Sequence, residues 1–353
     1  MRWIVPGVLL VLSLIGLITL RSVTPSLVPL QATFVMLGVA TFLFSWKIGF
    51  DTWSTFRWPM YAGLVVLLIA TLLFAGITRG TSQWLTIAGI NVQGSQLAVP
   101  IVGLVLAHYA SRVGLGTIKQ IVIFGVMALV PAVLIVLAPD LGTTLILLFS
   151  IFGIAFTSNL KTYWLVGGFF SVLIFSVVAW NFFLAPYQQA RITSFVQPSA
   201  DMQGSGYNAR QALIAVGSGQ LFGRGLGQGV QSHLRFLPER QTDFIFASLA
   251  EEWGFVGATL VIFLYVALVS AYVIKAWQLP PSAEYYFFMA TSFFFMFQVL
   301  VNIGMNMQLM PITGITLPFV SYGGSSFIAF CFHCGVAQSI FDVQAEKKMQ
   351  HFG

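Results

Sequence analysis

The sequence predicts an all-α, polytopic integral membrane protein with about ten transmembrane helices and one long extracytoplasmic loop. Of its 353 residues, 58% are hydrophobic and only 7% are charged, and the mean hydropathy is +0.90. A soluble protein of this size would need a far more charged surface. Apolar runs of about 18 to 25 residues recur along the chain, and each is long enough to cross a bilayer. They do not alternate polar and apolar residues, which argues against a β-barrel.

Ten apolar segments account for most of the chain, and short connections such as 138–142 indicate antiparallel neighbouring helices. There is no internal repeat and no linker, so residues 1–353 are expected to form a single integral membrane domain. The first segment follows Arg2 but lacks a clear cleavage site, so we expect it to be a retained span. The predicted spans are Trp3–Leu20, Leu27–Trp46, Pro59–Thr78, Ser95–Ser111, Ile118–Leu137, Thr143–Thr157, Tyr163–Leu184, Phe244–Ile274, Glu284–Leu309 and Gly324–Phe341.

The net charge of +6 is a signal of membrane topology. With ten spans and a cytoplasmic N-terminus, every lysine falls in or beside a cytoplasmic segment, as the positive-inside rule predicts. Both termini are therefore expected in the cytoplasm. This distribution argues against nucleic acid as a partner. The lysines are Lys47, Lys119, Lys161, Lys275, Lys347 and Lys348.

The two cysteines, Cys331 and Cys334, lie with His333 inside the last predicted span. No second pair of ligands accompanies them, so we interpret them as small core residues and not as a metal site.

The long loop, residues 185–243, carries arginines and no lysine. A loop of this length is usually functional, and arginine forks bind phosphate oxygens in a bidentate way. We therefore expect Arg191, Arg210, Arg224 and Arg240 to bind an anionic head group such as a diphosphate. The alternative is that the loop arginines, which include Arg235, pair with Asp201 and Glu239 or contact lipid phosphates in general.

Two further segments are rich in glycine. Gly217–Gly229 does not have the pattern of a phosphate-binding P-loop, but its glycines would allow close approach of the backbone to a ligand. Met310–Gly324 has proline and glycine interruptions before Ser321 and Tyr322. Irregular backbone at membrane depth must be buried in protein or line a wet cavity, so we expect a re-entrant or cap-like element on the outer side.

Leu237–Gly257 concentrates five ionisable residues in a chain with few charges. Ionisable groups at a membrane boundary are functional candidates. Asp243 lies where the loop meets a helix: it fits an N-cap, and it also fits a general base. Glu251 and Glu252 lie about two turns further on. Helical spacing does not decide which of the two faces a cavity, and one of them is expected to pair with an arginine.

Four motifs make the chain resemble the SEDS family (shape, elongation, division and sporulation) over almost its whole length. They are PDLGTTLIL (139–147), AVGSGQLFGRGLGQG (215–229), LPERQTDFIFASLAEEWGFVG (237–257) and NIGMNMQLMPITGITLPFVSYGGSS (302–326). In the third motif, LPER is followed by TDFIFA and AEE. This sequence is more similar to the elongation branch of the family, which is RodA-like, than to the division branch.

The resemblance implies a ten-span peptidoglycan glycosyltransferase in the bacterial plasma membrane that polymerises lipid II at its outer face. It implies a class B penicillin-binding protein and the elongation machinery as partners, besides membrane lipids. The essential aspartate of the family corresponds to Asp243. Glu239, Trp84, Ser321 and Tyr322, with the four arginines named above, are the expected substrate-binding residues. A divalent cation such as Mg²⁺ or Mn²⁺ is an expected but unassigned cofactor.

The sequence departs from the family pattern at two places. Gln241 stands where the family has a histidine before Thr-Asp. A histidine at this position therefore cannot be required for the reaction. A glutamate and a lysine of the family are replaced together by Gln96 and Val99, as expected for an ion pair that is lost as a unit.

Two other classes of function compete with the enzyme. A lipid II flippase would place polar groups near the bilayer midplane, whereas the polar residues here concentrate at the outer edge. A scaffold for the penicillin-binding protein would not need Asp243. Both considerations favour the enzyme.

Overall fold

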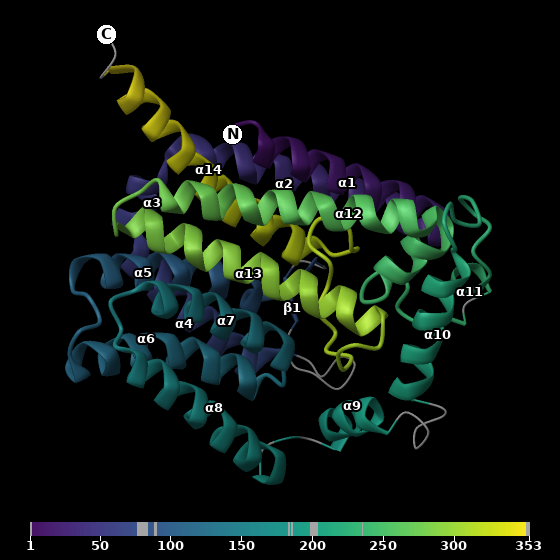
Figure 1. Ribbon diagram of the computed structural model, residues 1–353, viewed down its shortest axis with the longest axis horizontal. Helices are drawn as coiled ribbons and strands as arrows, with labels where there is room; N and C mark the ends of the chain where they lie inside the picture. The colour runs from purple at the N-terminus through teal and green to yellow at the C-terminus, as the bar shows by residue number, and fades with distance from the viewer. Residues whose placement is uncertain are drawn as a thin grey trace.

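The computed structural model is a bundle of long helices with a helical cap at one end (Figure 1). It describes residues 2–75, 84–87, 90–182, 184, 186–197, 204–234 and 236–350. The ten predicted spans correspond to α1 (Ile4–Val23), α2 (Val28–Ile48), α4 (Arg57–Phe74), α5 (Ala98–Arg112), α6 (Ile118–Leu137), α7 (Leu141–Thr157), α8 (Thr162–Phe182), α12 (Ile245–Trp277), α13 (Ala283–Asn306) and α14 (Gly324–Gln350).

Within the described residues, eight helices are long and apolar enough to cross a membrane, and α7 is an apolar helix of 17 residues. The polytopic all-α architecture is thus confirmed. Short elements complete it: η1 (Pro25–Leu27), α3 (Phe50–Thr55), η2 (Gly94–Leu97), and a small antiparallel hairpin of β1 (Leu85–Ile87) and β2 (Ile90–Val92).

The centre of the bundle is α13, which packs against α5, α7 and α12. Its phenylalanine-rich face supplies the contacts: Phe294 and Phe295 are fully buried, and Phe297 stacks on Phe149 of α7 at 4.6 Å. Aromatic packing of this kind holds helices together in lipid, where apolar burial alone favours no association.

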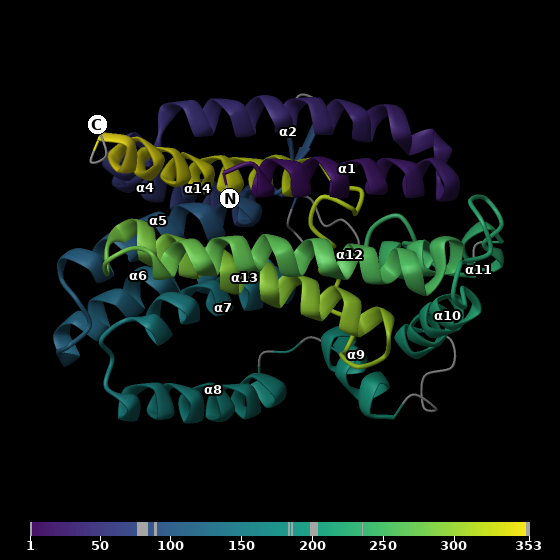
Figure 2. The ribbon, with the colours of Figure 1, turned by 45° about the horizontal axis from the view of Figure 1, so that its top comes forward.

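A second close pair is formed by α2 and α14 (Figure 2). A Cβ added to Gly335 of α14 would lie 2.5 Å from the carbonyl oxygen of Phe42 in α2, so only glycine lets the two backbones approach.

The long loop contains three helices in its described part, joined by turns that include the glycine-rich stretch 219–229. It forms α9 (Pro186–Val196), α10 (Ser205–Ser218) and α11 (Val230–His233), which lie at the end of the bundle remote from both chain termini (Figures 1 and 2). Between α13 and α14 the chain has no helix, and we call residues 307–323 the irregular segment. Its first half is partly exposed, whereas Leu317, Phe319 and Ser321 in its second half are buried. The expected irregular element is present there.

Candidate active site at the start of α12

The segment 237–244 is held in place by an apolar cluster at the junction of α10 and α12. Phe244, Ala247 and Leu237 are buried against Ala212 and Ala215 of α10. The cap of the bundle and the first turn of α12 therefore pack as one unit around Asp243.

Hydrogen bonds fix the backbone on both sides of Asp243. The side-chain amides of Asn302 and Asn306 in α13 each donate to its carbonyl oxygen at 3.1 Å. The Ser321 hydroxyl donates to the Thr242 carbonyl at 2.7 Å, and the Tyr322 N–H donates to the Gln241 carbonyl at 2.9 Å. Ser321 and Tyr322, predicted as substrate-binding residues, thus lie directly beside Asp243 and position its segment.

The carboxylate of Asp243 and the guanidinium of Arg191 border the same point of the chain. Gly314 has a φ of +77°, and a Cβ added there would lie 3.6 Å from Arg191 Nη1 and 3.7 Å from Asp243 Oδ2. Arg191 comes from α9 and Gly314 from the irregular segment, so three distant parts of the sequence meet here. A positive and a negative group that border one point of a partly buried site can serve acid–base chemistry on an anionic substrate.

The N-cap interpretation of Asp243 is wrong. The helix α12 begins at Ile245 with Phe244 as N-cap, and no side chain caps it. The turn before it is stabilised by Glu239, which has a φ of +48° and whose carboxylate accepts hydrogen bonds from Gln241 and Thr242. Glu239 therefore shapes the turn that carries Asp243.

A cavity of about 60 Å³ lies beside Arg191, between α9, α10 and the irregular segment. Arg191, Ser194 and Gln308 give it polar walls, and Phe195, Met310 and Ile312 give it apolar ones. Its size suits a small polar group, and the same guanidinium reaches both this cavity and Gly314.

Asp140 is a buried acidic residue near this site that was not among the predicted site residues. It N-caps α7 and accepts hydrogen bonds from Gln93 at 3.0 Å and Ser95 at 3.1 Å. A Cβ on Gly142 would lie 3.3 Å from the carbonyl oxygen of Thr313, which places this cluster next to Gly314. An aspartate directly before an apolar run was the available signal, whereas its partners were not deducible from spacing.

Gln96 and Val99, where the family has a glutamate and a lysine, lie next to this cluster. The Gln96 amide donates to the Thr143 hydroxyl at 3.4 Å, and Val99 is buried in α5. A neutral contact thus stands where the family has charged residues.

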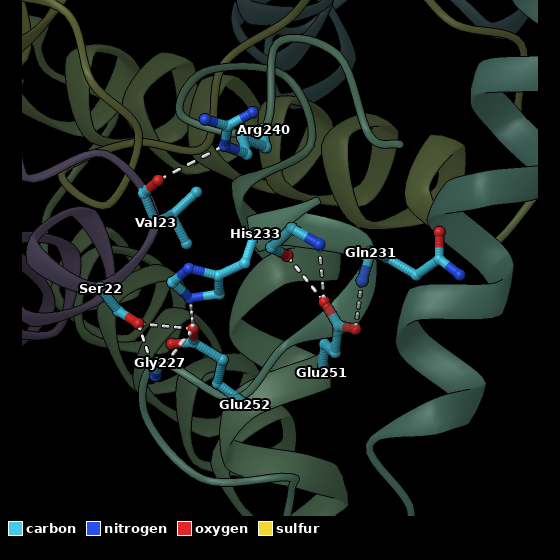
Figure 3. Close-up of polar contacts among 9 residues, drawn as sticks. Ser22, Val23, Gly227, Gln231, His233, Arg240, Glu251 and Glu252 are labelled. Carbon is cyan, nitrogen blue, oxygen red and sulfur yellow. Dashed lines mark hydrogen bonds and ion pairs between the residues drawn. The ribbon is translucent and has the colours of Figure 1, made fainter. Parts of the chain in front are cut away.

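Glu251 and Glu252 are both buried and both engage the long loop (Figure 3). Glu251 accepts hydrogen bonds from the N–H groups of Gln231 and Ser232 and from the Ser232 hydroxyl at 2.7 Å. Glu252 contacts His233 Nε2 at 3.1 Å and accepts a bond from the Ser22 hydroxyl at 2.5 Å. The expected arginine partner is not among these contacts in the described part of the chain.

The glycine-rich loop 217–229 approaches α12 closely. At Gly254 the backbone of α12 leaves helical geometry, and a Cβ there would overlap the backbone nitrogen of Gly223. The N–H groups of Arg224 and Gly225 donate to the carbonyls of Glu251 and Glu252, which the kink leaves without helical partners. These glycines therefore let the loop dock closely on α12.

The remaining predicted residues are spread around this region. Arg240 is half-buried and its Nε donates to the Val23 carbonyl at 3.4 Å, which ties the segment to α1 (Figure 3). Arg224 is exposed and donates to the Ser218 carbonyl, and Arg210 is exposed on α10. Trp84 is half-buried directly before β1. Arg235 and Asp201 lie outside the described residues.

Burial raises the pKa of the Tyr322 phenol above its usual range. The hydroxyl is therefore a neutral hydrogen-bond donor at physiological pH.

The described residues contain no cluster of three or more His, Cys, Asp or Glu side chains that could hold a metal ion. Mg²⁺ commonly uses only one or two carboxylates together with substrate phosphates and water. The carboxylate of Asp243 fits that kind of shared site.

The helices and the buried polar site define a multi-pass membrane protein with a preorganised site at one end of its bundle. Residues 1–346 match the family model for cell cycle proteins named for FtsW, RodA and SpoVE, and the chain belongs to this family. The resemblance found in the sequence is thereby confirmed.

Curated relatives and solved structures agree with this assignment. The chain is 35% identical over 301 residues to the peptidoglycan glycosyltransferase MrdB of Escherichia coli K12, covering 82% of this chain and 78% of that one. It is 37% identical over 290 residues to a probable peptidoglycan glycosyltransferase FtsW of Shewanella sediminis, covering 76% and 68%.

Two structures share the fold over nearly the whole chain. A chain of a peptidoglycan synthase complex, whose structure concerns the coordination of polymerization and crosslinking, has a TM-score of 0.83 at 26% identity, with 97% of both chains covered. The rod shape determining protein RodA of Thermus thermophilus has a TM-score of 0.73 at 25% identity, with 96% of both chains covered.

Proposed function

We propose that this protein is a peptidoglycan glycosyltransferase that polymerises lipid II at the outer face of the bacterial plasma membrane. The observation that carries the proposal is the meeting of the Asp243 carboxylate and the Arg191 guanidinium at Gly314. Lipid II joins its sugar to a diphosphate, so a base and a cation side by side match the two demands of the reaction.

The reaction forms a bond between a sugar hydroxyl oxygen of the acceptor and the anomeric carbon of the donor. The bond from that carbon to the lipid diphosphate breaks, and the diphosphate leaves with the electron pair. Asp243 accepts the proton of the attacking hydroxyl, and Arg191 stabilises the negative charge on the leaving group.

Other groups hold this pair in position. Asn302, Asn306 and Ser321 bind the backbone of 242–243 and fix where the carboxylate lies. The neutral Tyr322 hydroxyl can donate a hydrogen bond to a sugar. Arg210, Arg224, Arg240, Glu239 and Trp84 remain proposed contacts of the substrate, further from the reacting atoms.

A divalent cation such as Mg²⁺ or Mn²⁺ is part of the proposal. It would be held by the diphosphate oxygens with one protein carboxylate, Asp243, and it would add positive charge at the leaving group.

A class B penicillin-binding protein is the proposed partner, and cell elongation the proposed process. The structure with the TM-score of 0.83 comes from a complex that coordinates polymerization with crosslinking, which supports such a partner. The chain is similar to both MrdB and FtsW, so these relatives do not separate elongation from division. The proposal of elongation therefore rests on the RodA-like features of the segment 237–257.

The experiment that tests the proposed function compares polymerisation with transport. The purified chain, with its partner, is incubated with lipid II, and glycan strands are separated by length. In parallel, vesicles containing the chain are tested for movement of fluorescent lipid II across the bilayer. Glycan strands are expected. Transport above protein-free vesicles without any polymer would make the chain a flippase and overturn the proposal.

A further inference from the structure

A second cavity is lined by the end of α2, by Arg2 just before α1, and by residues of α14. Figure 1 shows the end of α2 and both chain termini at the end of the bundle remote from α9, α10 and α11. The cavity has a volume of about 500 Å³, much larger than the cavity beside Arg191. Its lining includes Arg2, Leu43, Trp46, Lys47, Ser339 and Asp342.

One wall of this cavity is preorganised. Arg2 Nε lies 2.7 Å from Asp342 Oδ1, and Trp46 Nε1 donates to Asp342 Oδ2 at 2.6 Å. The Arg2 guanidinium also lies over the rings of Trp3 and Trp46, at 5.4 and 5.8 Å from their centres. The arginine is thus held in place by a carboxylate and two indoles while 47% of its side chain stays exposed.

The other wall offers a charge next to an apolar stripe. Lys47 is exposed and makes no hydrogen bond or ion pair with any residue that the structure describes. Leu43 and Val39 precede it by one and two helical turns, are exposed at 51% and 47%, and lie on the same face of α2. This arrangement is typical of a lipid-binding site. The ammonium group of Lys47 can contact the lipid phosphate, and the acyl chain can lie along the exposed apolar side chains.

The charges favour an anionic lipid. Arg2 and Lys47 are positive and Asp342 is negative, so the lining carries one net positive charge, which matches a single phosphodiester. Tryptophans and basic residues at helix ends are also typical of the depth at which lipid head groups lie.

We propose that this cavity binds the head group of an anionic phospholipid, with its acyl chain along Leu43 and Val39. The lipid belongs to the leaflet at the end of the bundle that carries both termini, which is the cytoplasmic leaflet in the expected topology. This site is independent of the proposed reaction.

The test measures binding of phosphatidylglycerol and of phosphatidylcholine, one at a time, to the purified full chain in a neutral detergent by native mass spectrometry. Phosphatidylglycerol is expected to bind more tightly. Lys47→Gln should weaken its binding about fivefold, as expected for one basic residue near a lipid surface. Lys119→Gln removes the same charge from an exposed position at the start of α6, outside this cavity, and should have no effect.

Three results would overturn the proposal. Equal losses in the two lysine variants would mean diffuse charge attraction, and equal binding of the two lipids would mean no head-group site. Binding of soluble glycerol phosphate as tight as that of phosphatidylglycerol would assign the cavity to a free phosphate compound. Unchanged melting temperatures of both variants confirm that folding is not the cause of a loss.

Discussion

At the scale of single residues, the arrangement at Gly314 separates the loop arginines into different classes. Arg191 borders the point that Asp243 also borders, whereas Arg224 is exposed and donates to the Ser218 carbonyl at the docked glycine-rich loop. Composition placed the arginines of the loop in a single group, because it shows where charge lies along the chain but not which side chains meet in space.

We expect Arg191→Lys to lower the rate of lipid II polymerisation by roughly tenfold or more, although the charge is kept. Lysine cannot form the bidentate contact with a phosphate, and hydrogen bonds to charged groups contribute about 1.5–3 kcal/mol each. The measurement is the initial rate of glycan formation by the purified variant. Arg112→Lys, at an exposed position in the last turn of α5 and outside the proposed site, is the matched control and should retain most of the activity. Equal activity in wild type and Arg191→Lys would contradict the role of the guanidinium.

Glu251 is expected to stabilise the cap of the bundle and not to act on substrate. Its carboxylate is fully buried and accepts three hydrogen bonds from Gln231 and Ser232. Glu251→Gln replaces one acceptor oxygen by a donor, which should cost about 1–3 kcal/mol of stability. The melting temperature of the purified variant measures this cost. Glu284→Gln, in the first turn of α13, should change it less. A Glu251→Gln protein with wild-type melting temperature would refute the structural role.

At the scale of elements, the kink of α12 is the contact that joins the span to the loop. Gly254 has φ +68° and ψ −165°, a conformation essentially restricted to glycine, and the loop forms hydrogen bonds with the carbonyls that the kink releases. The cap and α12 should therefore unfold together.

Gly254→Ala is expected to destabilise the protein by roughly 1–3 kcal/mol from backbone strain, with an added penalty for overlap with Gly223. Thermal unfolding in detergent measures the change. Gly125→Ala in α6 is the control, because a Cβ there meets nothing within 4 Å. Comparable melting temperatures in the two variants would show that the kink does not need glycine.

The membrane spans could be predicted from the sequence. The candidate site could be predicted only in part. Ile118–Leu137 was predicted with its exact ends, because an apolar run is bounded by a capping box at Thr117 and a turn. Asp243 and Ser321 were found because charge and serine are conspicuous against an apolar background. Other polar residues near the site form hydrogen bonds with partners more than 40 residues away in the sequence, and no local pattern reveals such contacts. They are Asp140, Asn302 and Asn306.

At the scale of the whole molecule, the two ends of the bundle have different chemistry. The helices α9, α10 and α11 lie at one end, and the end of α2 and both termini lie at the other (Figure 1). Arg191 belongs to α9, and Lys47 lies in the last turn of α2. This polarity agrees with an outer face for the reaction and an inner face for the lysines.

Labelling of introduced cysteines tests that orientation. Gln228→Cys, in the exposed part of the long loop, should react with an impermeant maleimide on intact cells. Lys119→Cys should react only after the membrane is opened. The native Cys331 and Cys334 are buried and give a low background. Labelling of Lys119→Cys on intact cells would reverse the assigned topology.

The most direct test of the central claim is the rate of glycan polymerisation by purified Asp243→Asn protein with lipid II and the partner. The amide is nearly isosteric with the carboxylate but cannot accept the proton, and loss of a general base lowers rates by about 10²–10⁴-fold. We predict a loss of that size with an unchanged melting temperature. Asp51→Asn, an exposed aspartate of α3, serves as the control and should polymerise normally. Polymerisation by Asp243→Asn at the wild-type rate would contradict the account.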